Sequence, residues 1–294
     1  MVTLRGWFGR TLQLLRILLC GLAFVGFGVG GVLLAWCVLP LVALWPGGAF
    51  ERRQLCQRLV RGAWIVFHDY MRLTGLVAFN HRQVELHVEH PSVIIANHPT
   101  LVDITALGSA LGAVCFVAKR PLFKNPVFGP LLRVCGHICG AERDVAEADG
   151  AFAQALLRLS EGHSVLLFPE GTRSPVHGLR RFRIGAFELA RRARVPLVVI
   201  GISAEPRALS KGTPWYRIPK VAMRLQLWPL LTFDNWDAVP GLESLSELRT
   251  RVRELLWERT VMPVKAGSNE PGPGSGAANF QHTEAILDIE KAIP

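Results

Sequence analysis

The sequence has no regular cysteine framework. Its six cysteines lie in apolar stretches at irregular spacing, which argues against a secreted disulfide scaffold and is typical of a reducing compartment. A Cys-Gly-His-Ile-Cys run occupies residues 135–139, but the sequence contains no second ligand pair with zinc spacing. We therefore expect no metal site.

Acidic residues are also in the minority. The chain has 294 residues, with 33 Lys and Arg against 23 Asp and Glu, for a formal net charge of +10. This excess favours anionic partners, namely phospholipid headgroups, an acidic carrier protein, phosphorylated substrates or nucleic acid. The arginines follow no recognisable motif for reading nucleic acid, and a membrane segment competes for the charge. We therefore expect an anionic membrane surface and no nucleic acid as partner.

No charged residue occurs between positions 17 and 44. Because this run exceeds the roughly 20 apolar residues that span a bilayer core, we expect residues 1–50 to anchor the chain in a membrane. The run is too long for a cleaved signal peptide and does not end in a small-x-small cleavage site. It fits either a single span or a re-entrant helix pair bent at the glycines between residues 26 and 31. Arginines on both sides leave the orientation open.

The rest of the chain divides into three predicted parts. Residues 51–80 alternate arginines with apolar residues near helical spacing, which predicts either an amphipathic helix at the membrane surface or an ordinary core-facing helix. Residues 81–263 carry short apolar runs separated by helix-length segments. Residues 264–294 begin with a stretch rich in Gly, Pro and Ser, so we expect a disordered C-terminal tail.

The pattern of residues 81–263 is typical of a βαβ fold. Four short apolar runs predict strands, at residues 92–96, 114–118, 164–168 and 195–203. Apolar residues three and four apart over 144–161 predict a crossover helix, and a capping box beginning at Ser244 predicts the start of another helix. We expect an α/β domain with a central, largely parallel sheet flanked by helices.

Three of the predicted strands end on polar residues suited to catalysis. Asn97 and His98 follow the first strand, Lys119 follows the second, and Pro169 with Glu170 follows the third. In open α/β sheets the binding crevice lies beyond the carboxyl ends of the strands, so we expect these residues to converge.

His98 and Asp103 are the candidate base and its partner. Five positions apart, they meet only across a bend, which Pro99 supplies because it forces His98 into an extended conformation and is tolerated at a helix start. A neutral imidazole is well matched to removing the proton of an attacking alcohol, and a carboxylate fixes its tautomer. Thr100 and Asp103 also form a capping box, so a plain helix cap beside a loop histidine is the alternative.

His68 and Asp69 form a second possible dyad. Adjacent residues on a helix diverge by about 100°, so these two side chains do not easily share a proton. We interpret them as surface residues near the membrane.

A second motif follows the third predicted strand, Phe168-Pro169-Glu170-Gly171-Thr172-Arg173-Ser174. Gly171 lets the backbone approach a ligand closely, and a backbone N–H near it is a candidate donor to an oxyanion. Arg173 offers a planar fork for a phosphate or carboxylate. A polar turn held by a Glu and Arg pair is the alternative, but the His98 motif upstream favours a catalytic site.

Together the two motifs resemble those of the glycerolipid acyltransferases, typified by bacterial 1-acylglycerol-3-phosphate acyltransferase. The resemblance covers residues 64–259 and implies an O-acyltransferase in which His98 is the general base and Asp103 stands behind it. It also implies which residues hold the polar head or phosphate of the acceptor: Glu170, Gly171, Thr172, Arg173, Lys119 and Arg143, with Asn97 and Pro169 supporting the motifs.

The resemblance implies the partners as well. An acyl thioester, on coenzyme A or on an acyl carrier protein, supplies the acyl group, and a lyso-lipid hydroxyl accepts it, without a metal or organic cofactor. Six arginines between residues 180 and 194 fit phospholipid or an acidic carrier protein, or form a solvated helix face with Glu188 paired to Arg192. We expect attachment to the inner (cytoplasmic) membrane, with the catalytic domain facing the cytoplasm.

Two departures from the family pattern leave the acceptor open. Members that make phosphatidic acid usually carry Gln-Ser after the catalytic His, where this chain has Pro99-Thr100, and Val199 replaces the second proline of their final motif. The Pro-Thr-Leu version looks more like bacterial members found with specialised lipids such as aryl polyenes. The expected acceptor is a lysophospholipid such as 1-acylglycerol-3-phosphate, with a specialised lipid as the alternative. A non-catalytic, basic lipid-binding protein is the alternative of another class.

Overall fold

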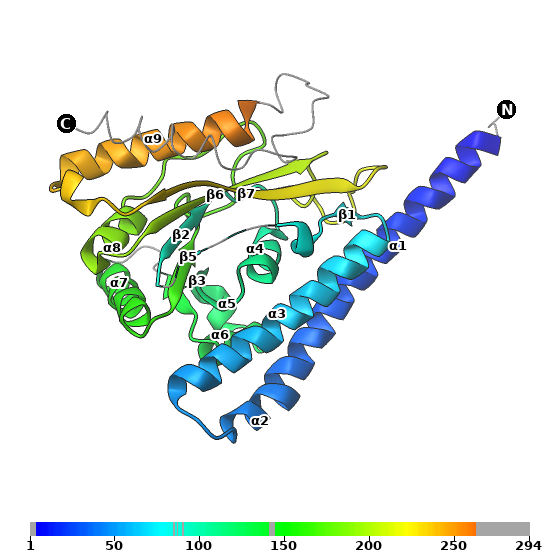
Figure 1. Ribbon diagram of the computed structural model, residues 1–294. Helices are drawn as coiled ribbons and strands as arrows, with labels where there is room; N and C mark the ends of the chain where they lie inside the picture. Colours follow the sequence, from blue (N-terminus) through cyan, green and yellow to red (C-terminus); the bar gives the residue numbers. More distant parts are fainter. Residues whose placement is uncertain (1–3, 85, 87, 90, 141–144, 263–294) are drawn as a thin grey trace.

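The centre of the protein is one seven-stranded sheet with the order β1-β7-β6-β2-β5-β3-β4. The computed structural model describes residues 4–84, 86, 88–89, 91–140 and 145–262 (Figure 1). All neighbouring strands are parallel except β6 and β7, which confirms the expected largely parallel sheet. The strands are β1 (Val77–Ala78), β2 (Val93–Ala96), β3 (Val114–Lys119), β4 (Ile138–Gly140), β5 (Ser164–Leu167), β6 (Leu197–Glu205) and β7 (Met223–Phe233).

Helices cover both faces of the sheet because its central strands are apolar on both sides. In β2, Val93 and Ile95 join a buried cluster with α7, α8 and α9, whereas Ile94 and Ala96 join another with α1, α3 and α4. Figure 1 shows α9 and α3 on opposite sides of the sheet. The helices that follow β1 are α4 (Asp103–Leu111), α5 (Arg120–Lys124), α6 (Phe128–Val134), α7 (Val145–Ser160), α8 (Gly185–Ala193) and α9 (Leu242–Thr260), with 3-10 turns η2 (His81–Gln83) and η3 (Trp236–Ala238).

The N-terminal helices form a hairpin beside this domain. Helix α1 (Leu4–Leu33) continues through a π-helical turn, η1 (Leu34–Val38), into α2 (Leu39–Ala43), and α3 (Ala49–Leu73) returns alongside α1 (Figure 1). The chain turns at residues 44–48, so the bend at residues 26–31, which the re-entrant alternative placed there, is wrong. The glycines there lie within a continuous α1, whose backbone hydrogen bonds leave no break at that point. Residues 9–42 are long and apolar enough to cross a bilayer.

One helix boundary and three strands, β1, β4 and β7, also differ from the sequence-based expectation. Helix α9 begins at Leu242 after Gly241 and uses no side-chain cap, so the helix start expected at Ser244 is wrong. Strand β7 was not expected at all, although Met223, Leu225 and Leu227 are buried and alternate with exposed residues. That alternation is the signal of a strand with one buried face. The expected C-terminal tail, residues 264–294, lies outside the described residues.

Helix α4 contacts α3 through a glycine. A Cβ built on Gly108 would lie 1.9 Å from Cζ3 of Trp64, so the indole occupies the space of a side chain. We expect Gly108→Ala to lower the free energy of unfolding by about 1–3 kcal/mol, because the indole must move. Urea denaturation in detergent measures this. The control is Gly62→Ala in α3, which faces open space and should be neutral or slightly stabilising. Equal effects of the two variants would contradict the packing argument.

Candidate active site

Asn97 holds the end of β2 against β6. Its side-chain amide donates to the carbonyl of Ile202 and accepts from the N–H of Ile202, both at 2.8 Å. The side chain is buried, so these bonds replace the backbone ladder at the point where the chain leaves the sheet. Asn97 therefore determines the position of the backbone at His98, which lies at the carboxyl ends of the parallel strands.

His98 and Asp103 meet across the bend at Pro99. Nδ1 of His98 lies 2.7 Å from Oδ2 of Asp103. The same carboxylate accepts the Thr100 N–H at 2.7 Å and the Thr100 hydroxyl. Asp103 is the first residue of α4 and is fully buried, where the positive end of the helix dipole favours a negative charge. Of the two alternatives that the sequence left open, the structure shows the histidine partner: among the described residues no side chain caps the start of α4, and the Thr100 hydroxyl donates to the carboxylate.

The imidazole of His98 is fixed on its other side by stacking. The ring lies parallel to that of Phe168, with 4.1 Å between centroids and 14° between planes. Since Nδ1 faces the carboxylate, the Nε2 edge faces away from it, and the His98 side chain is 19% exposed. A carboxylate at Nδ1 holds the proton there and leaves Nε2 with a lone pair. The arrangement presents a hydrogen-bond acceptor at the carboxyl ends of the parallel strands.

Ser174 ties the second motif to His98, a role that the sequence did not assign. The Ser174 N–H donates to the His98 carbonyl at 2.7 Å, and the Ser174 Oγ accepts the His98 N–H at 3.1 Å. The hydroxyl in turn donates to Glu170. The signal was its place directly after Arg173 in the motif.

Glu170 is buried inside the loop that it begins. Its carboxylate accepts the hydroxyl of Ser174 and the Arg180 N–H, the latter at 2.8 Å. Burial raises the pKa of Glu170, and these hydrogen bonds only partly oppose it. Glu170 therefore stabilises the loop of residues 170–180 through hydrogen bonds to Ser174 and Arg180.

Gly171 occupies a tight position in the same loop. Its φ of +69° suits glycine. A Cβ there would meet the guanidinium of Arg183 at 3.1 Å. Its N–H donates to the Phe168 carbonyl at 2.9 Å, so the donor considered for an oxyanion is already engaged within the turn. Pro169 is buried beside it and accepts the Arg183 N–H at 2.8 Å.

The expected phosphate-binding residues differ in their surroundings. Arg173 donates to the Leu209 carbonyl at 2.9 Å and is half-buried, while Thr172 beside it is partly exposed. Lys119 is exposed at the end of β3, two strand positions from β2, which corresponds to roughly 10 Å across the sheet. Arg143 lies outside the described residues.

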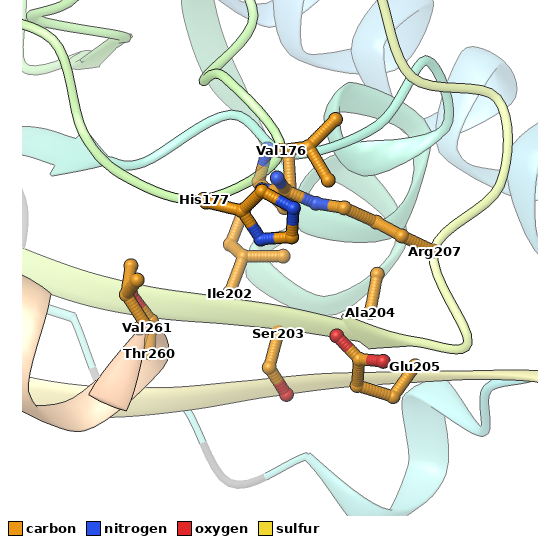
Figure 2. A pocket seen from close by; sticks show the side chains of 10 residues that line it. Val176, His177, Ile202, Ser203, Ala204, Glu205, Arg207, Thr260 and Val261 are labelled. Atoms are coloured by element: carbon orange, nitrogen blue, oxygen red, sulfur yellow. The ribbon is translucent and has the colours of Figure 1, made fainter. Parts of the chain in front are cut away.

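A pocket beside Pro99 contains a cation that no sequence motif indicated. Arg207 donates to the Pro175 carbonyl at 2.5 Å, and Figure 2 shows its side chain with His177 beside strand β6. Burial lowers the pKa of Arg207, which the carboxylates of Asp103, Glu205 and Glu170 oppose. The lining residues are Pro99, Val176, His177, Ile202, Ser203, Ala204, Glu205, Arg207, Thr260 and Val261.

The expectation that His68 is a surface residue is wrong. His68 is buried between α3 and α4, and its Nε2 lies 2.9 Å from the Thr105 hydroxyl. Burial lowers its pKa to about 4, so the ring is neutral at pH 7. The reason is packing, because α4 covers the face of α3 that carries His68.

Comparisons with known proteins agree with this fold. A family model described as Acyltransferase matches residues 75–203. The structure is similar to that of 1-acyl-sn-glycerophosphate acyltransferase from Thermotoga maritima, with a TM-score of 0.66 and 22% identity, over 89% of this chain and 100% of the other. The fold is thus that of an α/β acyltransferase.

Sequence relatives show the family to which the chain belongs. A 1-acyl-sn-glycerol-3-phosphate acyltransferase from Saccharomyces cerevisiae is 30% identical over 95% of this chain and 88% of its own length. The Escherichia coli protein of the same name is 32% identical over 57% of this chain and 66% of its own length. A chloroplastic relative from Brassica napus is 30% identical, and the chain spans only about a third (36%) of it. The chain belongs to the family of 1-acylglycerol-3-phosphate acyltransferase-like O-acyltransferases.

Removing the Ser174 hydroxyl tests its role in linking the second motif to His98. Ser174→Ala removes the hydroxyl that accepts the His98 N–H and one of the two hydrogen bonds to the Glu170 carboxylate, so we expect a loss of about 1–3 kcal/mol in the free energy of unfolding. The matched control is Ser210→Ala, since Ser210 is also buried and its hydroxyl has no partner among the described residues. Thermal or urea unfolding compares them, and a control as destabilised as Ser174→Ala would contradict the assignment.

Proposed function

We propose that this protein transfers an acyl group from a thioester, on coenzyme A or an acyl carrier protein, to a hydroxyl of a lysophospholipid, most simply 1-acylglycerol-3-phosphate. The observation that carries the proposal is the His98 imidazole, bonded at Nδ1 to buried Asp103 and with its other edge at the open end of the sheet. Family membership supports the reaction class, and the names of the relatives support the acceptor.

The proposed reaction needs one base that later acts as an acid. Nε2 of His98 takes the proton of the acceptor hydroxyl as its oxygen attacks the thioester carbonyl. The tetrahedral intermediate collapses, the carbon–sulfur bond breaks, and the imidazolium returns its proton to the leaving thiolate. Asp103 remains ionised and stabilises the imidazolium. The products are an ester and a free thiol, so no cofactor enters the balance.

We also propose that α1 lies in the membrane surface and does not cross the bilayer. One side of α1 carries an exposed apolar stripe, in which each residue is more than half exposed: Leu14, Leu18, Leu22, Val25 and Val29. Residues off this stripe bond to the domain: Gln13 of α1 donates to the Ile218 carbonyl, and beyond α1, Trp36 of η1 donates to the Pro126 carbonyl. A transmembrane α1 would carry these domain loops into hydrocarbon, where irregular backbone facing lipid is not tolerated. An interfacial helix with the domain at the membrane surface avoids this cost. The inner membrane and a cytoplasmic domain remain our prediction.

The acceptor's phosphate is proposed to meet Lys119 and Arg173. Lys119 is exposed at the same edge of the sheet as His98, and Arg173 stands in the loop that holds His98. Arg143, outside the described residues, keeps the same proposed role. Glu170 and Gly171 support the site through the loop described above, since Glu170 is buried.

Replacing the proposed base tests the reaction itself. We expect His98→Ala to lower kcat for acyl transfer by about two orders of magnitude or more, because the proposed general base is removed. The measurement is the release of free thiol from acyl-coenzyme A and from acyl carrier protein, with a lyso-lipid acceptor. His81→Ala, outside the site, is the control and should keep normal activity. A His98→Ala enzyme with nearly full activity would refute the proposed mechanism.

Lys119 tests the charge of the acceptor. With 1-acylglycerol-3-phosphate we expect Lys119→Ala to raise KM about tenfold, since a charge-assisted hydrogen bond is lost. With monoacylglycerol, which has no phosphate, KM should stay the same. If wild-type enzyme prefers the uncharged acceptor and Lys119→Ala changes neither KM, the acceptor is a lipid without this phosphate, as a specialised pathway would supply.

A further inference from the structure

Residues 211–221 form a loop that is fastened along α1. The loop joins β6 to β7, and its backbone carbonyls face the polar side chains of the helix. Three hydrogen bonds hold it there: Gln13 Nε2 to the Ile218 carbonyl at 3.0 Å, Arg16 Nε to the Pro219 carbonyl at 3.2 Å and Arg16 Nη2 to the Val221 carbonyl at 3.1 Å. The loop and the helix therefore lie side by side and contribute to one continuous surface.

Trp215 brings this loop to the edge of the apolar stripe. A Cβ built on Gly21 would lie 3.4 Å from the Trp215 ring, so the indole rests on this glycine. On the surface of a helix, the neighbours of Gly21 are the residues three before and four after it, Leu18 and Val25. Both belong to the stripe. Trp215 is nevertheless 46% exposed, and Tyr216 next to it is 51% exposed.

The same loop is basic. Lys211, Arg217 and Lys220 are exposed, and the sequence has no acidic residue from position 206 to position 233. Tryptophan and tyrosine favour the boundary between headgroups and acyl chains, and lysine and arginine favour the phosphates of anionic lipids. Aromatic and basic side chains beside an apolar stripe fit a bilayer surface better than they fit water.

We propose that residues 211–221 form a second contact with an anionic phospholipid bilayer, in which Trp215 and Tyr216 enter the interface and the three cations meet lipid phosphates. The proposal rests on the attachment of α1 proposed above and adds a separate element to it. The loop follows directly from Leu209, whose carbonyl accepts the Leu101 N–H at 3.0 Å and the Arg173 guanidinium at 2.9 Å. Lipid contact at the loop would therefore lie one short segment from the loop that holds His98.

Vesicle binding of the full-length chain tests the proposal. Purified protein is mixed with vesicles of phosphatidylethanolamine, with or without phosphatidylglycerol, and the bound fraction is measured by flotation. We expect Trp215→Ser/Tyr216→Ser to lower the partition coefficient about tenfold on both vesicle types. Arg217→Gln/Lys220→Gln should lower it by about fivefold for each cation on anionic vesicles only, an effect that high salt removes.

Matched controls lie away from α1. Leu157→Ser on α7 removes an apolar side chain that is 52% exposed, and Arg251→Gln on α9 removes an exposed cation. Both should bind vesicles as the wild type does. Circular dichroism checks that every variant is folded, and the charge variant, whose side chains are exposed, serves where the aromatic variant does not fold. Folded loop variants that bind both vesicle types as tightly as the wild type would overturn the proposal.

Activity separates this proposal from the proposed function. With a short-chain lyso-lipid dispersed below its micelle concentration, the loop variants should retain wild-type acyl transfer, because none of these residues belongs to the site. With the acceptor in vesicles their rate should fall together with binding. A wild-type protein that acylates no acceptor would refute the proposed function, whereas normal binding by the loop variants would refute only the loop contact.

Discussion

The buried carboxylate of Asp103 is the interaction on which the site depends. It stands at the start of α4, accepts the N–H and hydroxyl of Thr100, and orients Nδ1 of His98. A buried charge is costly unless it is hydrogen-bonded, and here each bond also defines the path of the bend at Pro99. The hydrogen bonds that shape the chain before α4 and the bond that orients the imidazole therefore involve the same carboxylate. Of the two interpretations of the Thr100 and Asp103 pair, the structure shows the histidine partner and not the helix cap, because no described side chain caps α4.

The rest of the site holds the chain on either side of that bend. Asn97 fixes the chain before it by pairing with the backbone of Ile202 in β6. Ser174 fixes His98 itself by bonding to both its N–H and its carbonyl. Phe168, at the end of β5, stacks on the ring. Three neighbouring strands, β6, β2 and β5, thus contribute to holding one side chain, which is the preorganisation that the proposed proton transfer requires.

Most of the contacts made by the second motif stabilise its own loop. Glu170 is buried and bonds Ser174 and Arg180, Gly171 packs against Arg183, and Arg173 crosses to the Leu209 carbonyl. Its most direct effect is to shape a loop whose far end fastens His98. Arg207 lies close enough to Asp103 and Glu170 to interact with both charges. We propose that the groups that remain at the surface, Lys119 among them, recognise the acceptor.

The sequence by itself determined the four strands β2, β3, β5 and β6, the placing of the candidate site at their carboxyl ends, and the pairing of His98 with Asp103, because each depends on local periodicity or on a short bend. It did not reveal the short strands β1 and β4, or β7, although buried and exposed residues alternate along much of Met223–Phe233. Only the tertiary structure decided that α1 packs on the domain, that His68 is buried, that Ser174 and Arg207 stand at the site, and that residues 211–221 lie along α1. These contacts join residues distant in the chain, and such pairings are set by how the layers pack, which no local pattern records.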